Sequence, residues 1–172
     1  MPALSTRAPS ALERSIVIDA PIDRVFAFHL DTRNAARIAP PGQRVVSVEG
    51  TFPLRLGSEV RLRVRQLPSP WAQTWLVRVV QLEEPTLIVD DLLRGPFPAW
   101  RHEHRFARLP DGRTRLTDHV EYRLPAGALG RIADAVLARR ILLRSFRSRQ
   151  ERTRALLEGE VRTSALIANS SQ

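Results

Sequence analysis

The sequence contains no cysteine, no lysine, one methionine and one tyrosine among its 172 residues. Without cysteine the protein has no disulfide framework, no thiolate metal site and no cysteine nucleophile. The longest apolar runs, such as Leu87-Ile88-Val89, are far shorter than the roughly 20 residues that span a bilayer. Residues 1–15 also lack the apolar centre of a secretory signal. These absences argue against a disulfide scaffold and a membrane bundle, and they predict a cytoplasmic protein.

The basic residues lack variety, because all 27 positively charged residues are arginine. The 18 acidic residues leave a net charge of +9. So complete a preference for arginine is more typical of genome composition than of separate demands for guanidinium chemistry. The net charge favours anionic partners or surfaces but identifies none. With 43% hydrophobic and 26% charged residues, the chain has the composition of a globular protein.

The length suits a single domain. Residues 1–12 mix serine, proline and alanine without periodicity, and residues 161–172 end in a polar run, so we expect both to be flexible. No internal repeat or linker divides the remainder. We therefore predict one domain over residues 13–160.

The amino-terminal part predicts one strand and two short helices. Residues 14–19 have the pattern of a strand, and Pro21 lies near a helix start, where its missing N–H costs little. Asp31 or Thr32 is a suitable cap for a second short helix that ends at 36–38, before two prolines.

A long β region follows and leads into one long helix. Turn signals separate six candidate strands, at residues 43–49, 58–66, 72–83, 86–94, 99–109 and 113–124. Their connections are too short for parallel crossovers, so the sheet of seven strands should be antiparallel. Residues 127–158 then show a helical period. A helix of that length, roughly 48 Å at 1.5 Å per residue, is expected to lie across the apolar face of the sheet.

Three stretches resemble a known family. They are VFAFHLDTRNAARIAPP at 25–41, VDDLLRGPFPAWRHEHRF at 89–106 and TDHVEYRLPAGALGR at 117–131. The chain is similar to the START and Bet v 1-like superfamily, also called SRPBCC or polyketide cyclase/dehydrase-like, and in particular to a bacterial ligand-binding subfamily. The resemblance implies an α+β helix-grip fold, in which a seven-stranded antiparallel sheet wraps around a long C-terminal helix. Because this fold hosts many functions, the site must be argued from its residues.

Alternation along two strands predicts which side chains face inward. In strand 99–109 the inward face carries Trp100, His102, His104 and Phe106. In strand 113–124 it carries Leu116, Asp118, Val120 and Tyr122. The two faces agree if the turn between the strands is the three residues Pro110-Asp111-Gly112, with Gly112 in the left-handed region. This turn places His104 opposite Asp118 and His102 opposite Val120.

The same reasoning applied to the previous turn, with symmetry about Phe97, places Asp90 opposite His104. We therefore predict a row of three polar side chains across neighbouring strands: Asp90, His104 and Asp118. The side chains expected beside this row are Arg94, Trp100 and Tyr122.

Four interpretations of the row remain open. It is a buried polar ladder, a set of ligand-orienting groups in a cavity, an acid/base pair or a metal site. Two histidines two apart on a strand can chelate a metal ion, yet no further nitrogen or thiolate donor is evident. We therefore expect no metal and no cofactor.

The remaining histidines and tryptophans are less informative. His29 lies on the first predicted helix and His119 should face solvent, so we expect structural or surface roles for both. Trp71 and Trp75 lie around strand 72–83, where the expected role of each is core or cavity wall.

Arginines are concentrated on the predicted C-terminal helix, where eight lie between Arg131 and Arg154. A solvated face is one interpretation, and weak contact with an anionic surface or partner is another. The aromatic residues should point away from this basic surface, so we expect no specific nucleic-acid binding. The sequence has no G-x-S-x-G, Walker, G-x-G-x-x-G or H-E-x-x-H motif.

The family resemblance implies binding of a small hydrophobic or amphipathic ligand, lipid-, polyketide- or aromatic-like, in a cavity between the sheet and the C-terminal helix, and the predicted facing of the side chains supplies the residues. The expected walls are Trp100, Phe106, Leu116, Tyr122, Val136 and Leu143. The groups expected to orient its polar end are Asp90, His102, His104 and Asp118, with Arg94 as a further contact. One alternative is a polyketide cyclase or dehydratase that uses His104 as a general base. Another is an adaptor that binds anionic partners through the arginine-rich helix.

Overall fold

The computed structural model describes the backbone of residues 9–124 and 131–170 and the side chains of residues 9–124 and 136–163. The chain begins with strand β1 (Ser10–Ile18), helix α1 (Ile22–His29) and the 3₁₀ helix η1 (Thr32–Ala36). The next six elements are β2 (Gln43–Glu49), β3 (Glu59–Gln66), β4 (Ala72–Glu83), β5 (Leu87–Arg94), β6 (Ala99–Arg108) and β7 (Thr114–Arg123). The last is the long helix α2 (Arg131–Ser170).

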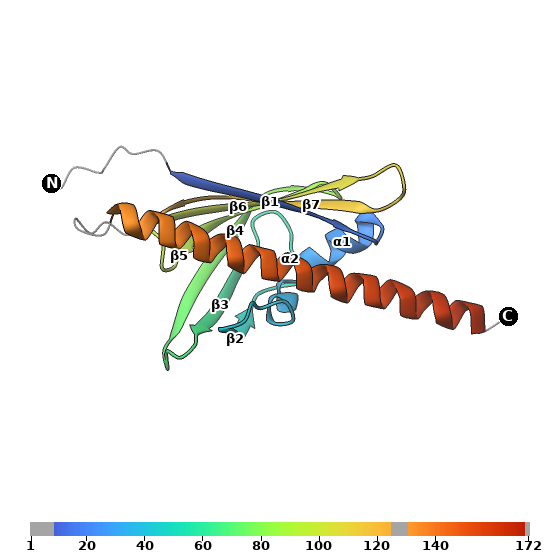
Figure 1. The fold of residues 1–172 in the computed structure, drawn as a ribbon, viewed down its shortest axis with the longest axis horizontal. Helices are drawn as coiled ribbons and strands as arrows, with labels where there is room; N and C mark the ends of the chain where they lie inside the picture. The colour runs from blue at the N-terminus through green and yellow to red at the C-terminus, as the bar shows by residue number, and fades with distance from the viewer. Residues whose placement is uncertain (1–8, 125–130, 171–172) are drawn as a thin grey trace.

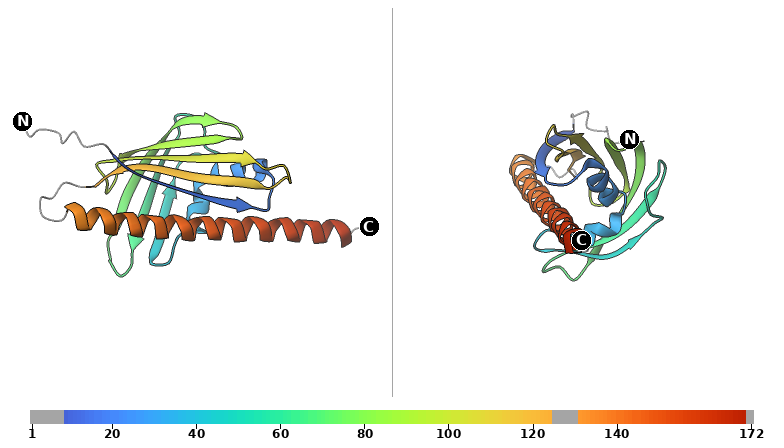
Figure 2. Two further views of the ribbon diagram at one scale, coloured as in Figure 1. Left: turned by 45° about the horizontal axis from the view of Figure 1, so that its top comes forward. Right: turned by 90° about the vertical axis from the view of Figure 1, so that its right-hand side faces the viewer.

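The seven strands form one antiparallel sheet in the order β1-β7-β6-β5-β4-β3-β2. The sheet curls around α1, and α2 lies along its open side (Figures 1 and 2). Of the strands, β1 has the most extensive packing against α2, while β2 at the opposite edge lies against η1. The predicted helix-grip α+β fold is confirmed.

Two elements are longer than the sequence predicts. β1 begins at Ser10 instead of residue 14, because its first residues continue the ladder to β7, with Ser10 opposite Tyr122. α2 continues to Ser170, past the end expected at residue 158. The loop expected at 127–130 lies outside the described residues.

Polar contacts fix the later part of α2 to the start of the fold. Glu158 accepts a hydrogen bond of 3.0 Å from the backbone N–H of Asp19. Glu160 forms ion pairs with Arg24 at 3.3 Å and with Arg37 at 2.9 Å. These contacts explain why the helix stays against the fold beyond the apolar stripe that the sequence pattern shows.

The turn between β6 and β7 has the predicted geometry. The backbone N–H of Leu109 donates to the carbonyl of Arg113 at 2.8 Å, so three residues form the loop. Gly112 has a φ of 84°, a backbone conformation that glycine adopts without strain. The predicted register is confirmed, with His104 opposite Asp118.

Buried apolar side chains form two clusters. The larger surrounds α1 and includes Phe26 and Phe106, whose rings meet edge to face at 5.2 Å. The smaller includes Trp100, Tyr122 and Phe146. Because both clusters contain residues of β6, the two β6 histidines lie between them, in the middle of the concave face.

Candidate ligand-binding site

A cavity of about 900 Å³ lies between the concave face of the sheet, η1 and α2. The β3 and β4 side chains on its wall are mostly apolar, namely Val60, Leu62, Val64, Trp75, Val77 and Val79. On the opposite side, α2 borders the cavity between Ile141 and Glu151. Pockets that bury small organic ligands have volumes of roughly 300–1,000 Å³, so this cavity is large enough for a molecule with several rings.

The structure brings most of the predicted contacts to or beside this cavity. Those that line it are Asp90, Trp100, His102 and His104. Leu116 and Asp118 lie behind them and border a gap of about 10 Å³, with room for one water molecule at most. Three further predicted contacts belong to the two apolar clusters and support the cavity wall from behind. They are Phe106, Tyr122 and Leu143.

Two predicted contacts are corrected. Arg94 is exposed at the end of β5 and is not among the described residues that line the cavity. Val136 is 51% exposed and is not among the described residues that line the cavity, of which Ile141 is the first on α2. The helical period identifies an apolar stripe along the helix, but it does not show which part of that stripe lies over the sheet.

The pairing of β5 with β6 also differs from the prediction. Asp90 lies opposite His102, and Ile88 lies opposite His104. The turn is not symmetric about Phe97, because the ring of Phe97 packs inward, 5.6 Å from that of Trp75 and 5.0 Å from that of Trp100. The register therefore shifts by two residues, which keeps Asp90 on the inward face.

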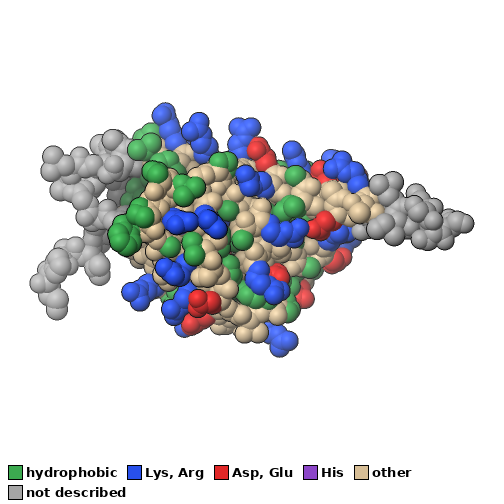
Figure 3. Space-filling view, turned by 90° about the horizontal axis from the view of Figure 1, so that it is seen from below, with side chains coloured by type: hydrophobic (Ala, Val, Ile, Leu, Met, Phe, Trp, Pro, Cys, Tyr) green, Lys and Arg blue, Asp and Glu red, His purple; other side chains and the backbone are tan. Residues whose placement is uncertain are grey.

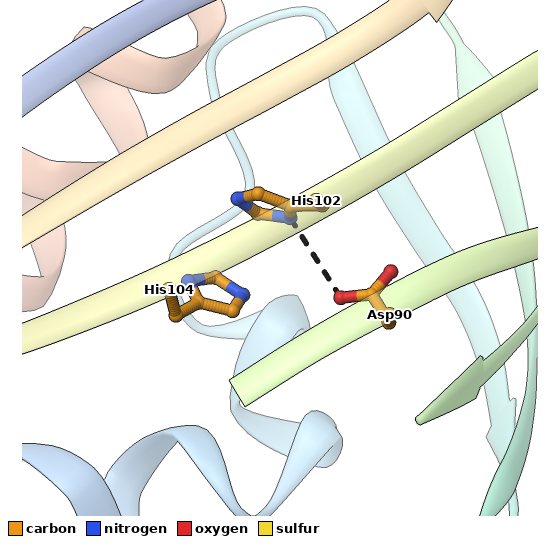
Figure 4. Close-up of side chains that lie close together, drawn as sticks. All are labelled: Asp90, His102 and His104. Atoms are coloured by element: carbon orange, nitrogen blue, oxygen red, sulfur yellow. Dashed lines mark ion pairs between the residues drawn. The ribbon is translucent and has the colours of Figure 1, made fainter. Parts of the chain in front are cut away.

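Asp118 connects the two histidines of β6. Its Oδ1 atom forms a hydrogen bond of 3.1 Å with His102 Nε2. The same oxygen lies 2.7 Å from His104 Nδ1, but that contact does not have the geometry of a hydrogen bond. Its Oδ2 atom accepts a hydrogen bond of 2.6 Å from Gln150 Nε2 on α2. Asp90 lies on the other side of the histidines, with Oδ2 3.9 Å from His102 Nδ1 (Figure 4).

Burial and the contacts between these side chains decide their protonation states. Burial lowers the pKa of His102, and burial together with the neighbouring His102 lowers the pKa of His104. Burial raises the pKa of Asp90 to about 6. Burial would also raise the pKa of Asp118, but its close contacts with both histidines outweigh burial and hold that pKa well below its usual range. At neutral pH an ionised Asp118 therefore lies between two neutral imidazoles.

A third histidine, which sequence reasoning placed in a structural or surface role, belongs to the same surroundings. His29 lines the cavity, and its ring lies 5.1 Å from that of His104. Burial, followed by the neighbouring His104, lowers the pKa of His29 to about 3. Its position four residues after Val25 and three after Phe26, on the buried face of α1, is the signal that could have found it.

Aromatic rings surround one end of the cavity. The ring of Trp75 lies 5.5 Å from that of Trp100, edge to face, so the predicted role in core or wall fits Trp75. Phe146 of α2 stacks on Trp100 at 6.2 Å and an interplanar angle of 21°. Trp71 is 79% exposed, so the same prediction is wrong for it, because it precedes β4 in the loop that follows two prolines.

The arginines of α2 divide between the cavity and the surface. Arg144, Arg147 and Arg149 border the cavity. Elsewhere arginine side chains are scattered over the face shown in Figure 3, with hydrophobic and acidic side chains between them. Among the described residues, no helix is apolar over a length that could span a bilayer.

Solved structures of several proteins have a similar fold. Protein CV1439 from Chromobacterium violaceum is 20% identical, with 87% of this chain and 99% of that chain covered and a TM-score of 0.68. The Zhui aromatase/cyclase from Streptomyces sp. R1128 is 24% identical, with 88% and 92% covered and a TM-score of 0.63. The di-domain ARO/CYC StfQ from the steffimycin biosynthetic pathway is 15% identical, with 90% and 52% covered and a TM-score of 0.73. At these identities the likeness shows the fold.

No curated protein sequence matches the chain. The sequence model of a family described as polyketide cyclase/dehydrase and lipid transport matches residues 10–158, from the first residue of β1 into α2. This match includes every strand of the sheet and all residues of the polar cluster, which consists of Asp90, His102, His104 and Asp118. The protein therefore belongs to the polyketide cyclase/dehydrase and lipid transport family.

Proposed function

We propose that the protein binds a small, largely apolar molecule that contains rings, with a polar end directed at Asp90, His102 and His104. The observation that carries the proposal is the cavity of about 900 Å³, whose largely apolar wall surrounds these polar groups. An apolar pocket with a few convergent polar groups is the usual signature of a small-molecule site. Membership of the family supports a ligand-binding or cyclase-type role.

The wall favours flat cyclic ligands over simple acyl chains. Trp75, Phe97 and Trp100 lie 5.0–5.6 Å apart at one end, and Phe146 closes the same end from α2. Aromatic rings gain additional stabilisation from stacked and edge-to-face contacts with other rings. A polyketide- or aromatic-like ligand therefore fits this wall better than a single hydrocarbon chain.

The polar cluster favours a ligand group that donates a hydrogen bond. Because His102 Nε2 contacts the ionised Asp118, the neutral ring carries its proton there, and Nδ1 is left as an acceptor beside Asp90. A ligand carboxylate at this position would meet the carboxylate of Asp90. A phenol or alcohol can instead donate to either acceptor.

A matched pair of probes tests this proposal. Native mass spectrometry of the purified protein, followed by solvent extraction, first identifies any ligand already bound. The protein is then titrated with 2-naphthol and with naphthalene, using quenching of tryptophan fluorescence. We expect naphthol to bind at least tenfold more tightly, and His102→Gln to reduce the difference. Equal affinities for the two probes would contradict the proposed polar contact.

A change in the wall provides the control for location. Leu62 faces the cavity and Arg61 faces outward on the same strand. Leu62→Gln should weaken the binding of both probes several-fold, and Arg61→Gln should leave it unchanged. If both substitutions have the same effect, the probes bind somewhere else.

Acid/base catalysis is a second candidate, favoured by the contact between His104 and Asp118. A carboxylate that holds one imidazole nitrogen while the other faces a cavity is the arrangement of a general base. Such an enzyme would remove a proton from a polyketide-like substrate during cyclisation or dehydration. His104→Gln would then abolish the loss of water from a linear poly-β-ketone, measured by mass spectrometry. In a binding protein the same substitution only weakens affinity.

A further inference from the structure

Three side chains from neighbouring strands bring metal-ligating atoms together beside the cavity. One atom each of Asp90, His102 and His104 lies within 4.8 Å of the other two. We propose that these three residues bind a divalent first-row transition metal ion. From the sequence no third nitrogen or sulfur donor is evident, but the observed register supplies an oxygen donor, with Asp90 directly opposite His102.

Contacts behind the histidines decide which nitrogens are available. Asp118 occupies His102 Nε2 at 3.1 Å and His104 Nδ1 at 2.7 Å. His102 Nδ1 lies on the opposite side, 3.9 Å from Asp90 Oδ2, and the second ring nitrogen of His104 faces the same space (Figure 4). Metal-binding histidines ordinarily direct their other nitrogen at a carboxylate or carbonyl in this way.

The supporting carboxylate is itself held in place. Gln150 donates to Asp118 Oδ2 at 2.6 Å, while Asp118 Oδ1 contacts both histidine rings. Neither ring can turn its free nitrogen away from Asp90 without losing its contact with Asp118. The two imidazoles are therefore oriented before an ion enters.

Binding requires a small closure of the three ligands. Atoms bound to a tetrahedral zinc ion at about 2.0–2.1 Å lie roughly 3.3 Å from one another, somewhat closer than His102 Nδ1 and Asp90 Oδ2 are here. The Asp90 side chain is partly exposed to the cavity, so its carboxylate can rotate toward the histidines. Three protein ligands leave at least one coordination position open to the cavity, as in catalytic zinc sites.

Charges of both signs lie near the three ligands. Asp90 and Asp118 contribute two carboxylates, and Arg149 of α2 is a positive group whose field reaches Asp90, with Arg144 and Arg147 also on the border of the cavity. The ring of His29 lies 5.1 Å from that of His104, and its Nδ1 atom is 2.8 Å from the carbonyl oxygen of Val25. Because His29 is not among the described residues whose ligand atoms lie within 4.8 Å of one another, we count it as a neighbour and not as a ligand.

The donor set indicates the class of ion. Two imidazoles and one carboxylate suit zinc, iron(II) or cobalt(II), whereas calcium and magnesium prefer sites made of oxygen alone. With such an ion bound, the polar end of an organic ligand would meet its open coordination position. Because the ion can be studied without an organic ligand, this inference can fail while the proposed ligand binding holds.

Titration of the untagged protein with metal alone tests the inference. After treatment with a chelator, the protein is titrated with Zn²⁺ by calorimetry and with Co²⁺ by visible absorption. We expect one ion per chain and a cobalt spectrum typical of four or five ligands. Asp90→Asn and His104→Gln should each weaken zinc binding at least tenfold. His119→Gln, on the outer face of β7, is the matched control and should bind zinc like the unchanged protein.

A further variant separates positioning from ligation. Asp118→Asn should keep one ion per chain but weaken its binding about 10- to 100-fold, because the histidines lose their support. Circular dichroism establishes that each variant is folded. Zinc binding by Asp90→Asn as tight as in the His119→Gln control would overturn the proposal. If the variants do not fold, the unchanged protein still decides, because a lack of one-to-one binding at micromolar zinc would overturn it.

Discussion

Gln150 Nε2 donates a hydrogen bond of 2.6 Å to Asp118 Oδ2, and so joins the middle of α2 to the residue of the polar cluster that lies on β7. The same nitrogen donates to the backbone carbonyl of Arg14 in β1, at 2.9 Å. One buried amide therefore connects the helix to two neighbouring strands. The helix and the cluster should be coupled in stability as well as in position.

Removal of this amide should destabilise the fold. Gln150→Leu leaves a buried carboxylate oxygen without its donor, and we expect the free energy of unfolding to fall by about 1–3 kcal/mol. Chemical denaturation followed by circular dichroism measures the change. Arg152→Gln, two residues further along and exposed, is the matched control and should leave stability unchanged. Equal stability of Gln150→Leu and the control would contradict the coupling.

The coupling itself can be measured with a double-mutant cycle. Asp118→Asn should cost on the order of 3 kcal/mol, because both histidines lose their ionised partner. In that background Gln150→Leu should cost less than it does alone. We expect an interaction energy of about 0.5–3 kcal/mol, as for residues in direct contact. Strict additivity of the two changes would show that the two side chains act independently.

Phe146 should contribute more to stability than any exposed residue of α2. It is 3% exposed, and its ring lies 6.2 Å from that of Trp100 and 5.1 Å from that of His102. Phe146→Ala should lower the free energy of unfolding by about 3 kcal/mol. Ile141→Ala, at a position that is 57% exposed on the same helix, should cost less than about 0.5 kcal/mol. Similar costs for the two changes would mean that α2 is not packed on the sheet as described.

The tryptophans should report on the cavity once the exposed one is replaced. Trp71→Phe removes the solvent-exposed indole and leaves Trp75 and Trp100, which line the cavity. We expect the emission maximum to move to shorter wavelength, with unfolding behaviour unchanged. The fraction of fluorescence quenched by 2-naphthol should rise. A maximum that does not move would place Trp71 in surroundings like those of the other two.

Glu160 should give a small pH-dependent contribution to stability. Hydrogen bonding with Arg37, and then with Arg24, lowers its pKa from the ordinary value of 4.5. The contribution is therefore present above pH 4.5 and is lost as the pH falls through the lowered pKa. Both pairs are partly exposed, so Glu160→Gln should cost less than about 1 kcal/mol near neutral pH. The difference between the two proteins should shrink on acidification and in high salt, whereas a constant difference would exclude an ionic origin.

The predictions from sequence succeeded where local geometry determined them. The turn at Pro110-Asp111-Gly112 is a three-residue loop with glycine at the left-handed position. The length of this loop fixes the register of β6 and β7, in which His104 lies opposite Asp118. The order of elements and the inward faces of β6 and β7 followed from alternation, and they were confirmed.

Sequence reasoning failed where side-chain packing decided the outcome. The ring of Phe97 turns toward Trp75 and Trp100, and the β5–β6 pairs are centred on Pro96 instead of Phe97. His29 approaches His104 only because α1 folds under the sheet, a contact between residues far apart in the chain. Neither relationship has a signature in local periodicity.

The middle of α2 is attached to one side of the sheet. Gln150 joins it to β1 and β7, while β2, β3 and β4 face it across the cavity (Figure 2). Movement of β3 and β4 away from the helix would break no contact made by Gln150. In the other direction, along the strands, the rings of Trp75, Phe97 and Trp100 close one end of the space. The protein should therefore accept molecules that differ in thickness more readily than molecules that extend past these rings.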